Sequence, residues 1–448
     1  MTAPYRLGEV RGDGGPQTPV REEDALEPGR PRARVRPALD GRIVVVAAVA
    51  LYGAAVAIAR AAWDVDLWPS LGVNSAPTLF YDARNVAAAA DCWALGYDPL
   101  VENPCDPAGR VMVYPRVWVV LHFVGVTQDR TLLFGGVLVA LFLASVLLLV
   151  GRLSVPKGVV VAAAVVSPAI MLAVERGNVD IVLFAVFVVA VFAWKARDRV
   201  TPLLSPALIV AAAIAKLYAI FALPAYWFTG VRRARWAVVG GVAVMGAYLL
   251  LTLGDVRQVL RSPEGGLLYS YGARILIGDL YHRFQPGTWA YGSLLAQLLA
   301  VIPVVAASVA IWVWLRRRLP EPSADERVSP RTLAFHLGAL TYLGTFATRK
   351  SGDYRLVFVL LTLPLLLEWA WGEPGTVRTM LGRVGLVAVV VGLYVGALSP
   401  FVAPWDELGS WAIAGAFVAL LAATVPRWRR SSGPEPGREA TTLGADAG

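Results

Sequence analysis

The sequence has few charged residues, few lysines and almost no cysteine, and each shortage excludes a class of protein. Charged residues make up 16% of the 448-residue chain, whereas an ordinary soluble domain carries about 25%. Runs of roughly 20 apolar residues recur along the chain instead. We therefore predict an all-α polytopic membrane protein, in which one helical bundle in the lipid bilayer takes up most of the chain.

Because lysine is scarce, arginine supplies most of the positive charge. The arginines stand in short clusters between the apolar runs, as the positive-inside rule predicts, so the net charge of +9 does not indicate nucleic-acid binding. The first apolar run begins only at Ile43, and no cleavable signal peptide is expected. We expect residues 1–40 and 427–448 to be disordered cytoplasmic tails. Residues 41–426 are then the membrane domain of a multi-pass protein of the cell membrane, with both termini in the cytoplasm.

The only two cysteines, Cys92 and Cys105, lie in one polar loop, residues 63–116. Two cysteines alone make a poor metal site, and the three histidines are scattered. We therefore expect no metal and no cofactor. If the loop lies outside the cytosol, a disulfide between Cys92 and Cys105 is expected, and two unpaired thiols are the alternative.

The same loop concentrates charge beside the first predicted span. Its charged side chains are Asp64, Asp66, Asp82, Arg84, Asp91, Asp98, Glu102, Asp106, Arg110 and Arg116. Residues 78–95 are predicted to form a helix that Gly96 ends. We interpret the loop as an extracytoplasmic catalytic loop resting on a cavity in the membrane.

Asp82 is the candidate general base, because a carboxylate at the membrane surface can take the proton of an attacking sugar hydroxyl. The alternative is a carboxylate that only favours the start of the helix through its dipole. Asp64 and Asp66 form a pair that suits a divalent cation, although two carboxylates at the end of a span are also expected simply to be solvated.

If the spans alternate in direction and the arginine clusters between them stay on the inner side, the sequence predicts ten crossings. They are residues 43–62, 131–150, 157–174, 179–194, 236–253, 291–315, 332–348, 356–371, 380–398 and 411–425. Residues 114–126 are apolar but short, which predicts a half-helix at the interface. Residues 203–228 have arginines at both ends, and one crossing would place a cluster outside. We therefore predict a re-entrant pair of half-helices with Lys216 near its apex.

Three polar stretches fall among the apolar runs. A charge inside a membrane segment tends to face a cavity or a partner, so Lys216 suits a lipid-linked phosphate, unless its stem carries the charge to the interface. The turn from Glu175 to Asn178 is either part of a site or a turn held by its own Glu–Arg pair. Arg349, Lys350 and Arg355 form an outer cationic turn that suits phosphate, or that pairs with nearby acids.

Together these stretches resemble the GT-C membrane glycosyltransferases, and most closely glycosyltransferase family 87, the actinobacterial polyprenol-phosphate-mannose-dependent mannosyltransferases. The resemblance covers residues 40–425. The stretches that carry it are Phe80-Tyr81-Asp82-Ala83-Arg84, Gly96-Tyr97-Asp98-Pro99, Asn103-Pro104, Tyr114-Pro115-Arg116, Glu175-Arg176-Gly177-Asn178, Lys216 with Pro224, and Asp353-Tyr354-Arg355.

The resemblance implies that Asp82 is the catalytic base and that a polyprenyl-phosphate sugar, with mannose as the sugar, enters from the bilayer. A glycan or glycolipid acceptor from the cell envelope then attacks with inversion, on the outer face. The residues expected to bind substrate are Arg84, Tyr114, Arg116, Glu175, Arg176, Asn178, Lys216, Arg349, Lys350, Asp353, Tyr354 and Arg355. Family members often carry a histidine near Asp353, and its absence here leaves the acceptor and the sugar open.

Two other functions fit part of the pattern. A transporter or flippase for a lipid-linked sugar explains Lys216 and the outer cations but not the acidic loop, and the sequence has no internal repeat of the kind that marks many transporters. A scaffold for envelope assembly predicts a purified protein without activity.

Overall fold

The computed structural model describes residues 39–261, 270–273, 275–276, 294–348, 351–398 and 407–427. Arg349 and Lys350 lie outside the described residues. So do both predicted tails, apart from residues 39–40 and Arg427.

Helices make up nearly all of the described structure. The first half contains α1 (Arg42–Trp63), η1 (Pro69–Leu71), α2 (Tyr81–Ala94), η2 (Arg116–Val124), η3 (Gln128–Arg130), α3 (Thr131–Val150), α4 (Val155–Val165), α5 (Pro168–Arg176), α6 (Asp180–Ala193), α7 (Thr201–Ala215), η4 (Leu217–Ala222), α8 (Ala225–Phe228), α9 (Arg232–Leu251) and α10 (Leu253–Arg261). The second half contains β1 (Ser270–Tyr271), α12 (Leu294–Arg318), α13 (Ala324–Val328), α14 (Pro330–Thr348), β2 (Ser351–Gly352), η6 (Asp353–Thr362), α15 (Leu363–Ala370), α16 (Val377–Val395), η7 (Gly396–Leu398) and α18 (Glu407–Thr424). The two short strands pair antiparallel, Ser270 with Gly352 and Tyr271 with Ser351.

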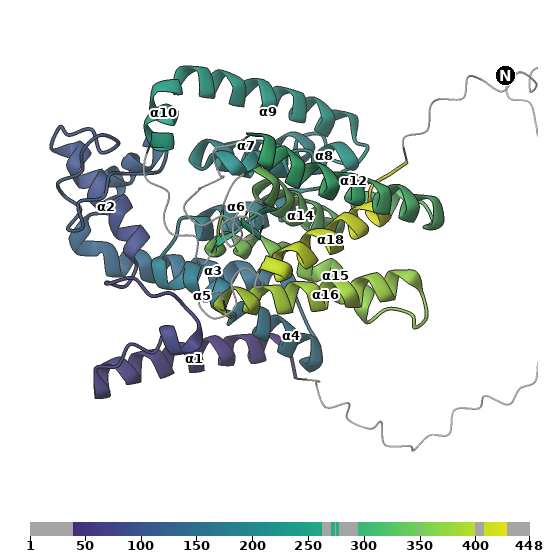
Figure 1. The fold of residues 1–448 in the computed structure, drawn as a ribbon, viewed down its shortest axis with the longest axis horizontal. Helices are drawn as coiled ribbons and strands as arrows, with labels where there is room; N and C mark the ends of the chain where they lie inside the picture. Colours follow the sequence, from purple (N-terminus) through teal and green to yellow (C-terminus); the bar gives the residue numbers. More distant parts are fainter. Residues whose placement is uncertain are drawn as a thin grey trace, which may run out of the picture. The chain divides into compact units, whose positions relative to one another are not determined.

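The predicted class, an all-α polytopic membrane protein, is confirmed. Among the described residues, five helices are long and apolar enough to cross a bilayer, or six if the bent pair α4 and α5 counts as one span. The predicted ten crossings are not confirmed by this count. Figure 1 shows α6 and α14 in the middle of the bundle and α1 and α9 at its margins. Burial follows the same order, since most of α14 is buried whereas α1 buries only Val45 and Ala59.

The span predicted at residues 157–174 is divided by a bend of 58° between α4 and α5. Ser167 has an extended backbone, with φ −65° and ψ 151°, and Pro168 begins α5. A residue before proline is disfavoured in helical geometry, and proline itself fits the first turn of a new helix. The Ser167-Pro168 step therefore turns the chain and directs the end of α5 toward the candidate site.

The segment predicted to be broken near Lys216 is broken at that residue. α7 ends at Ala215, Lys216 is extended with φ −160° and ψ 109°, and the 3₁₀-helix η4 follows. η4 packs against α14, where a Cβ on Gly344 would lie 2.2 Å from the Phe221 ring. The re-entrant path of the whole segment stays a prediction. The short helix predicted at residues 114–126 is present as the 3₁₀-helix η2, Arg116–Val124, and its place at the interface stays a prediction.

Candidate functional site

The candidate site is built around Lys216, a residue that is only 8% exposed. The break that exposes this residue to the interior also frees carbonyl oxygens at the end of α7, which need partners where water is excluded. Trp118 Nε1 donates a hydrogen bond to the Ala215 carbonyl at 2.8 Å, and the Tyr248 hydroxyl donates to the Ile214 carbonyl at 3.4 Å. Residues from η2 and α9 thus stabilise the break that carries the lysine.

The lysine forms an ion pair with Asp180, which is fully buried in the first turn of α6. The positive end of the α6 dipole also favours a carboxylate there. Our sequence analysis did not select Asp180, because it was assigned to the beginning of an apolar span. A carboxylate within such a run is the signal that should have identified it.

Asn178 connects this ion pair to Asp82. Its Nδ2 donates to Asp82 Oδ2 at 2.6 Å, and its Oδ1 accepts from Lys216 Nζ at 3.3 Å. The two neighbours fix the orientation of the amide, since a carboxylate can only accept and an ammonium can only donate. Arg176 also approaches Asp82, with Nη1 3.9 Å from Oδ1. The carboxylate of α2 and the lysine at the α7 break therefore share one amide.

Tyrosine rings surround the cations of this cluster. Lys216 Nζ lies 5.1 Å from the centre of the Tyr114 ring, 5.6 Å from Tyr218 and 5.4 Å from Tyr354. Cations within about 6 Å of an aromatic face are attracted to it, more strongly when water is excluded. Burial, and next the Asp82 carboxylate, raise the pKa of Tyr114 well above its ordinary value. Its hydroxyl therefore stays protonated and can donate a hydrogen bond.

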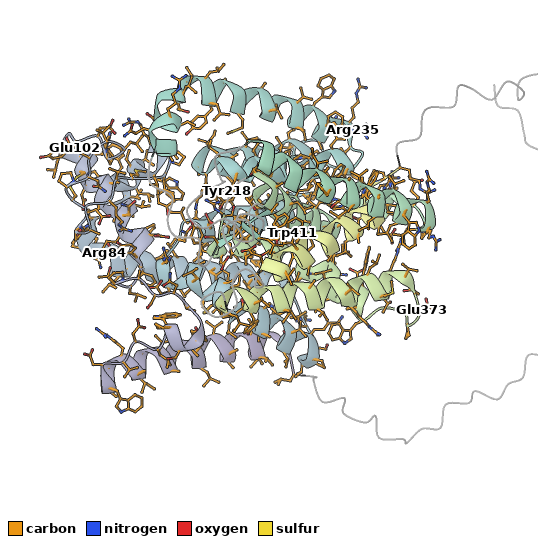
Figure 2. The ribbon with its side chains drawn as sticks, in the orientation of Figure 1. Arg84, Glu102, Tyr218, Arg235, Glu373 and Trp411 are labelled. Carbon is orange, nitrogen blue, oxygen red and sulfur yellow. A yellow bond between two sulfur atoms is a disulfide. The ribbon has the colours of Figure 1, made fainter. Side chains whose placement is uncertain are left out.

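Arg355 brings a second cation to the same rings. Its guanidinium lies 4.8 Å from the Tyr218 ring and 5.8 Å from the Tyr354 ring, and Nη1 donates to Ser351 Oγ at 2.9 Å. Within the described part of the chain, no carboxylate forms an ion pair with it. Tyr218, a further residue that our sequence analysis did not select, lies within the bundle in Figure 2.

Asp82 is held in place by the residue two positions before it. Phe80 precedes α2 with φ 58°, a left-handed conformation that is strained for a bulky side chain. Its backbone N–H donates to the Glu175 carbonyl at 2.8 Å. The Phe80 ring fits against two glycines: an added Cβ would lie 2.0 Å from the ring at Gly135 and 3.1 Å from it at Gly177. This packing fixes the start of α2, and with it Asp82, against α3 and the end of α5.

The rest of the polar loop is cross-linked to α2. Cys92 on α2 and Cys105 form a disulfide. Asp106 accepts a hydrogen bond from Asn85 Nδ2 at 2.7 Å and pairs with Arg110 at 2.9 Å. These contacts tie the two halves of the loop together around the helix that carries Asp82.

Several predicted site residues lie outside the cluster. Arg116 makes a two-pronged contact with Asp98, at 2.9 and 2.8 Å, and reaches Asp255 of α10 at 2.8 Å. Arg84 and Glu175 line a separate cavity between α1 and α3, and Arg84 lies on the α2 side of the molecule in Figure 2. Asp353 is buried at the start of η6, beside Gly396.

The Asp64 and Asp66 pair has other partners. Asp64 lies 3.0 Å from Arg60, and Asp66 accepts a hydrogen bond from Ser75 at 2.6 Å. In the part of the chain that the structure describes, no group of three or more His, Cys, Asp or Glu side chains is arranged to hold a metal ion.

The comparison with known families places part of this cluster in a recognised domain. No curated protein and no solved structure matches the chain. The family model that does match covers Asn178, Asp180 and Lys216, while Asp82 and Arg355 lie outside its range. Residues 116–329 match the model of glycosyltransferase family 87, so this part of the chain is similar to that family of glycosyltransferases.

Proposed function

We propose that the protein is an inverting glycosyltransferase that moves mannose from a polyprenyl-phosphate donor to a glycan or glycolipid acceptor of the cell envelope, on the outer face of the membrane. The observation that carries the proposal is the Asn178 bridge between Asp82 and Lys216. A carboxylate that can accept a proton and cations that can bind phosphate then serve a single reaction centre.

Asp82 acts as the general base. An acceptor hydroxyl attacks the anomeric carbon, its proton passes to the Asp82 carboxylate, and the bond from that carbon to the phosphate oxygen breaks with its electron pair on the oxygen. The Asn178 hydrogen bond and nearby Arg176 hold the carboxylate in one position. Attack opposite the leaving group inverts the anomeric centre, and the products are the glycoside and polyprenyl phosphate.

Arg355 and Lys216 stabilise the departing phosphate. Asp180 already neutralises much of the Lys216 charge, so Arg355, which has no such ion pair within the described residues, is the stronger candidate. The planar guanidinium matches phosphate oxygens in a forked geometry. The rings of Tyr114, Tyr218 and Tyr354 keep water away from the cations, which strengthens their effect on a charge that develops during reaction. Arg349 and Lys350 are expected to add to this charge.

The outer location rests on two features of the polar loop. A disulfide persists in an oxidising compartment rather than in the cytosol. The arginines before α1, at Arg30, Arg32, Arg34 and Arg36, favour a cytoplasmic start for this span, so the loop that follows it emerges on the other side.

The test is a transfer assay with purified protein, polyprenyl-phosphate-mannose and a panel of envelope acceptors. Asp82→Asn keeps the Asn178 contact sterically possible but cannot take a proton, so transfer should fall by about a hundred- to ten-thousand-fold with donor binding retained. Asp64→Asn, at an exposed carboxylate of the same loop, is the matched control and should transfer normally. Unchanged transfer by Asp82→Asn would show that Asp82 is not the base, whereas a wild-type protein that binds the donor but transfers no sugar would favour the transporter.

A further inference from the structure

Two arginines fasten the ends of α12 and α18 together, on the side of the bundle that is predicted to be cytoplasmic. Arg316, in the last turn of α12, donates hydrogen bonds to the carbonyl oxygens of Val425 and Pro426, just after α18. Arg427 donates in return to the carbonyls of Arg316 and Leu319, at 2.6 and 2.9 Å. The last carbonyls of a helix lack partners within the helix, and arginine side chains can supply them. Figure 1 shows α12 beside α18.

These contacts fix the arginines in place but leave their charge unbalanced. The last turn of α12 also contains Arg317 and Arg318, and both are exposed. Glu321 accepts a hydrogen bond from the Arg427 backbone N–H at 3.3 Å, but one negative charge cannot balance four positive ones. In the described part of the chain, no carboxylate forms an ion pair with any of the four guanidinium groups. We call these residues the arginine cluster: Arg316, Arg317, Arg318 and Arg427.

Tryptophans and apolar side chains indicate the depth of the arginine cluster in the membrane. The Arg316 guanidinium lies 4.9 Å from the centre of the Trp312 ring, and that of Arg318 lies 4.4 Å from the Trp314 ring. Tryptophan is enriched where the bilayer meets water. Trp314 is exposed, and α12 carries further exposed apolar side chains before it, among them Val309. Those side chains suit acyl chains, so the arginine cluster lies at the depth of the lipid headgroups.

Phosphate is the anion that this surface fits best, because its oxygens match the forked donors of arginine. A free phosphate would contact the arginines alone. A phospholipid would also place its acyl chains along the exposed apolar side chains of α12, and basic clusters beside a membrane helix attract anionic headgroups. We propose that the arginine cluster at the ends of α12 and α18 binds the headgroup of an anionic phospholipid. This inference does not depend on the proposed function.

The test is photolabelling of the full-length protein in phosphatidylcholine nanodiscs that contain a trace of phosphatidylglycerol with a diazirine in one acyl chain. We expect label on peptides from α12 and α18, and we expect added unlabelled phosphatidylglycerol to displace it. Inorganic phosphate in the buffer should not displace it. Displacement by inorganic phosphate would mean a site for free phosphate. Equal labelling by a diazirine phosphatidylcholine would mean ordinary contact with the bilayer, and either result would overturn the inference.

Substitutions of exposed arginines test whether the two helix ends form one site. Arg317→Gln combined with Arg318→Gln should weaken labelling roughly thirtyfold, and Arg427→Gln should weaken labelling of α12 about fivefold, the effects expected for two and for one arginine near an anionic surface. The matched control combines Arg232→Gln with Arg233→Gln, at exposed positions of α9, and should leave labelling of α12 and α18 unchanged. An equal loss in the control would show that only the overall charge matters. Full labelling of α12 in Arg427→Gln would show that the helix ends do not act together, and each of these outcomes contradicts the inference.

Discussion

At the scale of single residues, the pair formed by Lys216 and Asp180 should control stability. Removing one partner of a buried ion pair leaves an uncompensated charge, which costs about 3–5 kcal/mol. Asp180→Asn should therefore lower the thermal unfolding midpoint strongly in detergent. Combining it with Lys216→Met, which replaces the ammonium with an apolar side chain of similar size, should restore most of the stability but not the transfer activity.

The matched control is the exposed pair of Arg197 and Asp325, whose side chains are 95% and 90% exposed. Exposed pairs contribute little, so Asp325→Asn should leave the midpoint unchanged. A midpoint for Asp180→Asn equal to that of Asp325→Asn would mean that the buried pair contributes nothing to the stability of the site.

Sequence reasoning selected Lys216 and Asp82 because each carries chemistry that its surroundings do not explain. It placed both residues in one pocket, but it did not predict that Asn178, which is 96 residues from Asp82 in the chain, joins them. A contact of that range depends on the packing of α2 against the end of α5, which residue types alone do not reveal. The roles of these residues in catalysis stay predictions.

At the scale of elements, the position of α2 depends on the absence of a side chain at Gly135. Gly135→Ala would place its Cβ about 2.0 Å from the Phe80 ring, so the start of α2 must shift and Asp82 with it. We expect the kcat for sugar transfer to fall at least tenfold. The fold should persist, which the thermal unfolding midpoint measures. Pairing Gly135→Ala with Phe80→Ala should recover part of the activity, and Gly136→Ala should be neutral. A fully active Gly135→Ala protein would show that the packing of the Phe80 ring against Gly135 does not position Asp82.

The contact between Arg116 and Asp98, at the end of the polar loop that also reaches α10, should respond to acid. Hydrogen bonds from Arg116 hold the pKa of Asp98 below its ordinary value of 3.8. The contact therefore stabilises the fold fully above that value and loses its effect as the pH falls through the lowered pKa. At neutral pH, the thermal unfolding midpoint of the wild type should be higher than that of Asp98→Asn. In strong acid, the two midpoints should be equal. The gain should be small, about 1 kcal/mol or less, because both side chains are exposed. A difference that persists in strong acid would contradict this.

Element boundaries follow the apolar runs closely where a helix stands alone. α1 and α3 match their predicted spans within a residue or two. The break at Lys216 was predictable because a central charge is expensive in a membrane. The bend at Ser167-Pro168 was not predicted, because the prediction followed apolar content and did not use Pro168 as a signal. The 3₁₀ geometry of η2 was not predicted either, since apolar content does not distinguish a 3₁₀-helix from an α-helix.

At the scale of the whole molecule, two helices that are too short to be identified as membrane spans, α6 and α7, lie near the candidate site. α6 and α7 have 14 and 15 residues, which is roughly 21–23 Å of helix, less than the ~30 Å of a bilayer core. A length criterion therefore passes over both helices, although residues 179–194 are a predicted crossing and most of α6 is buried. A bundle whose central helices are shorter than the membrane has room for a cavity at their ends, which is where Asp180 and Lys216 lie.

The side of the membrane on which Arg233 lies distinguishes two possible paths for the segment between α6 and α9. Lys195 and Arg233 are exposed residues on either side of it. If α7 and the helices after it enter and leave on the same side, both residues are cytoplasmic, as the positive-inside rule favours. A single crossing instead places Arg233 outside.

Cysteine substitutions can separate the two paths, because the native cysteines are joined in a disulfide. In intact cells, a membrane-impermeant maleimide should label Asp129→Cys, an exposed position in η3 just before α3 that is predicted to lie outside, but not Lys195→Cys or Arg233→Cys. Permeabilised cells should label all three. If Arg233→Cys reacts in intact cells while Lys195→Cys does not, the segment crosses the membrane. Lys216 would then lie at the break of a spanning segment, and the predicted orientation of every later helix would invert.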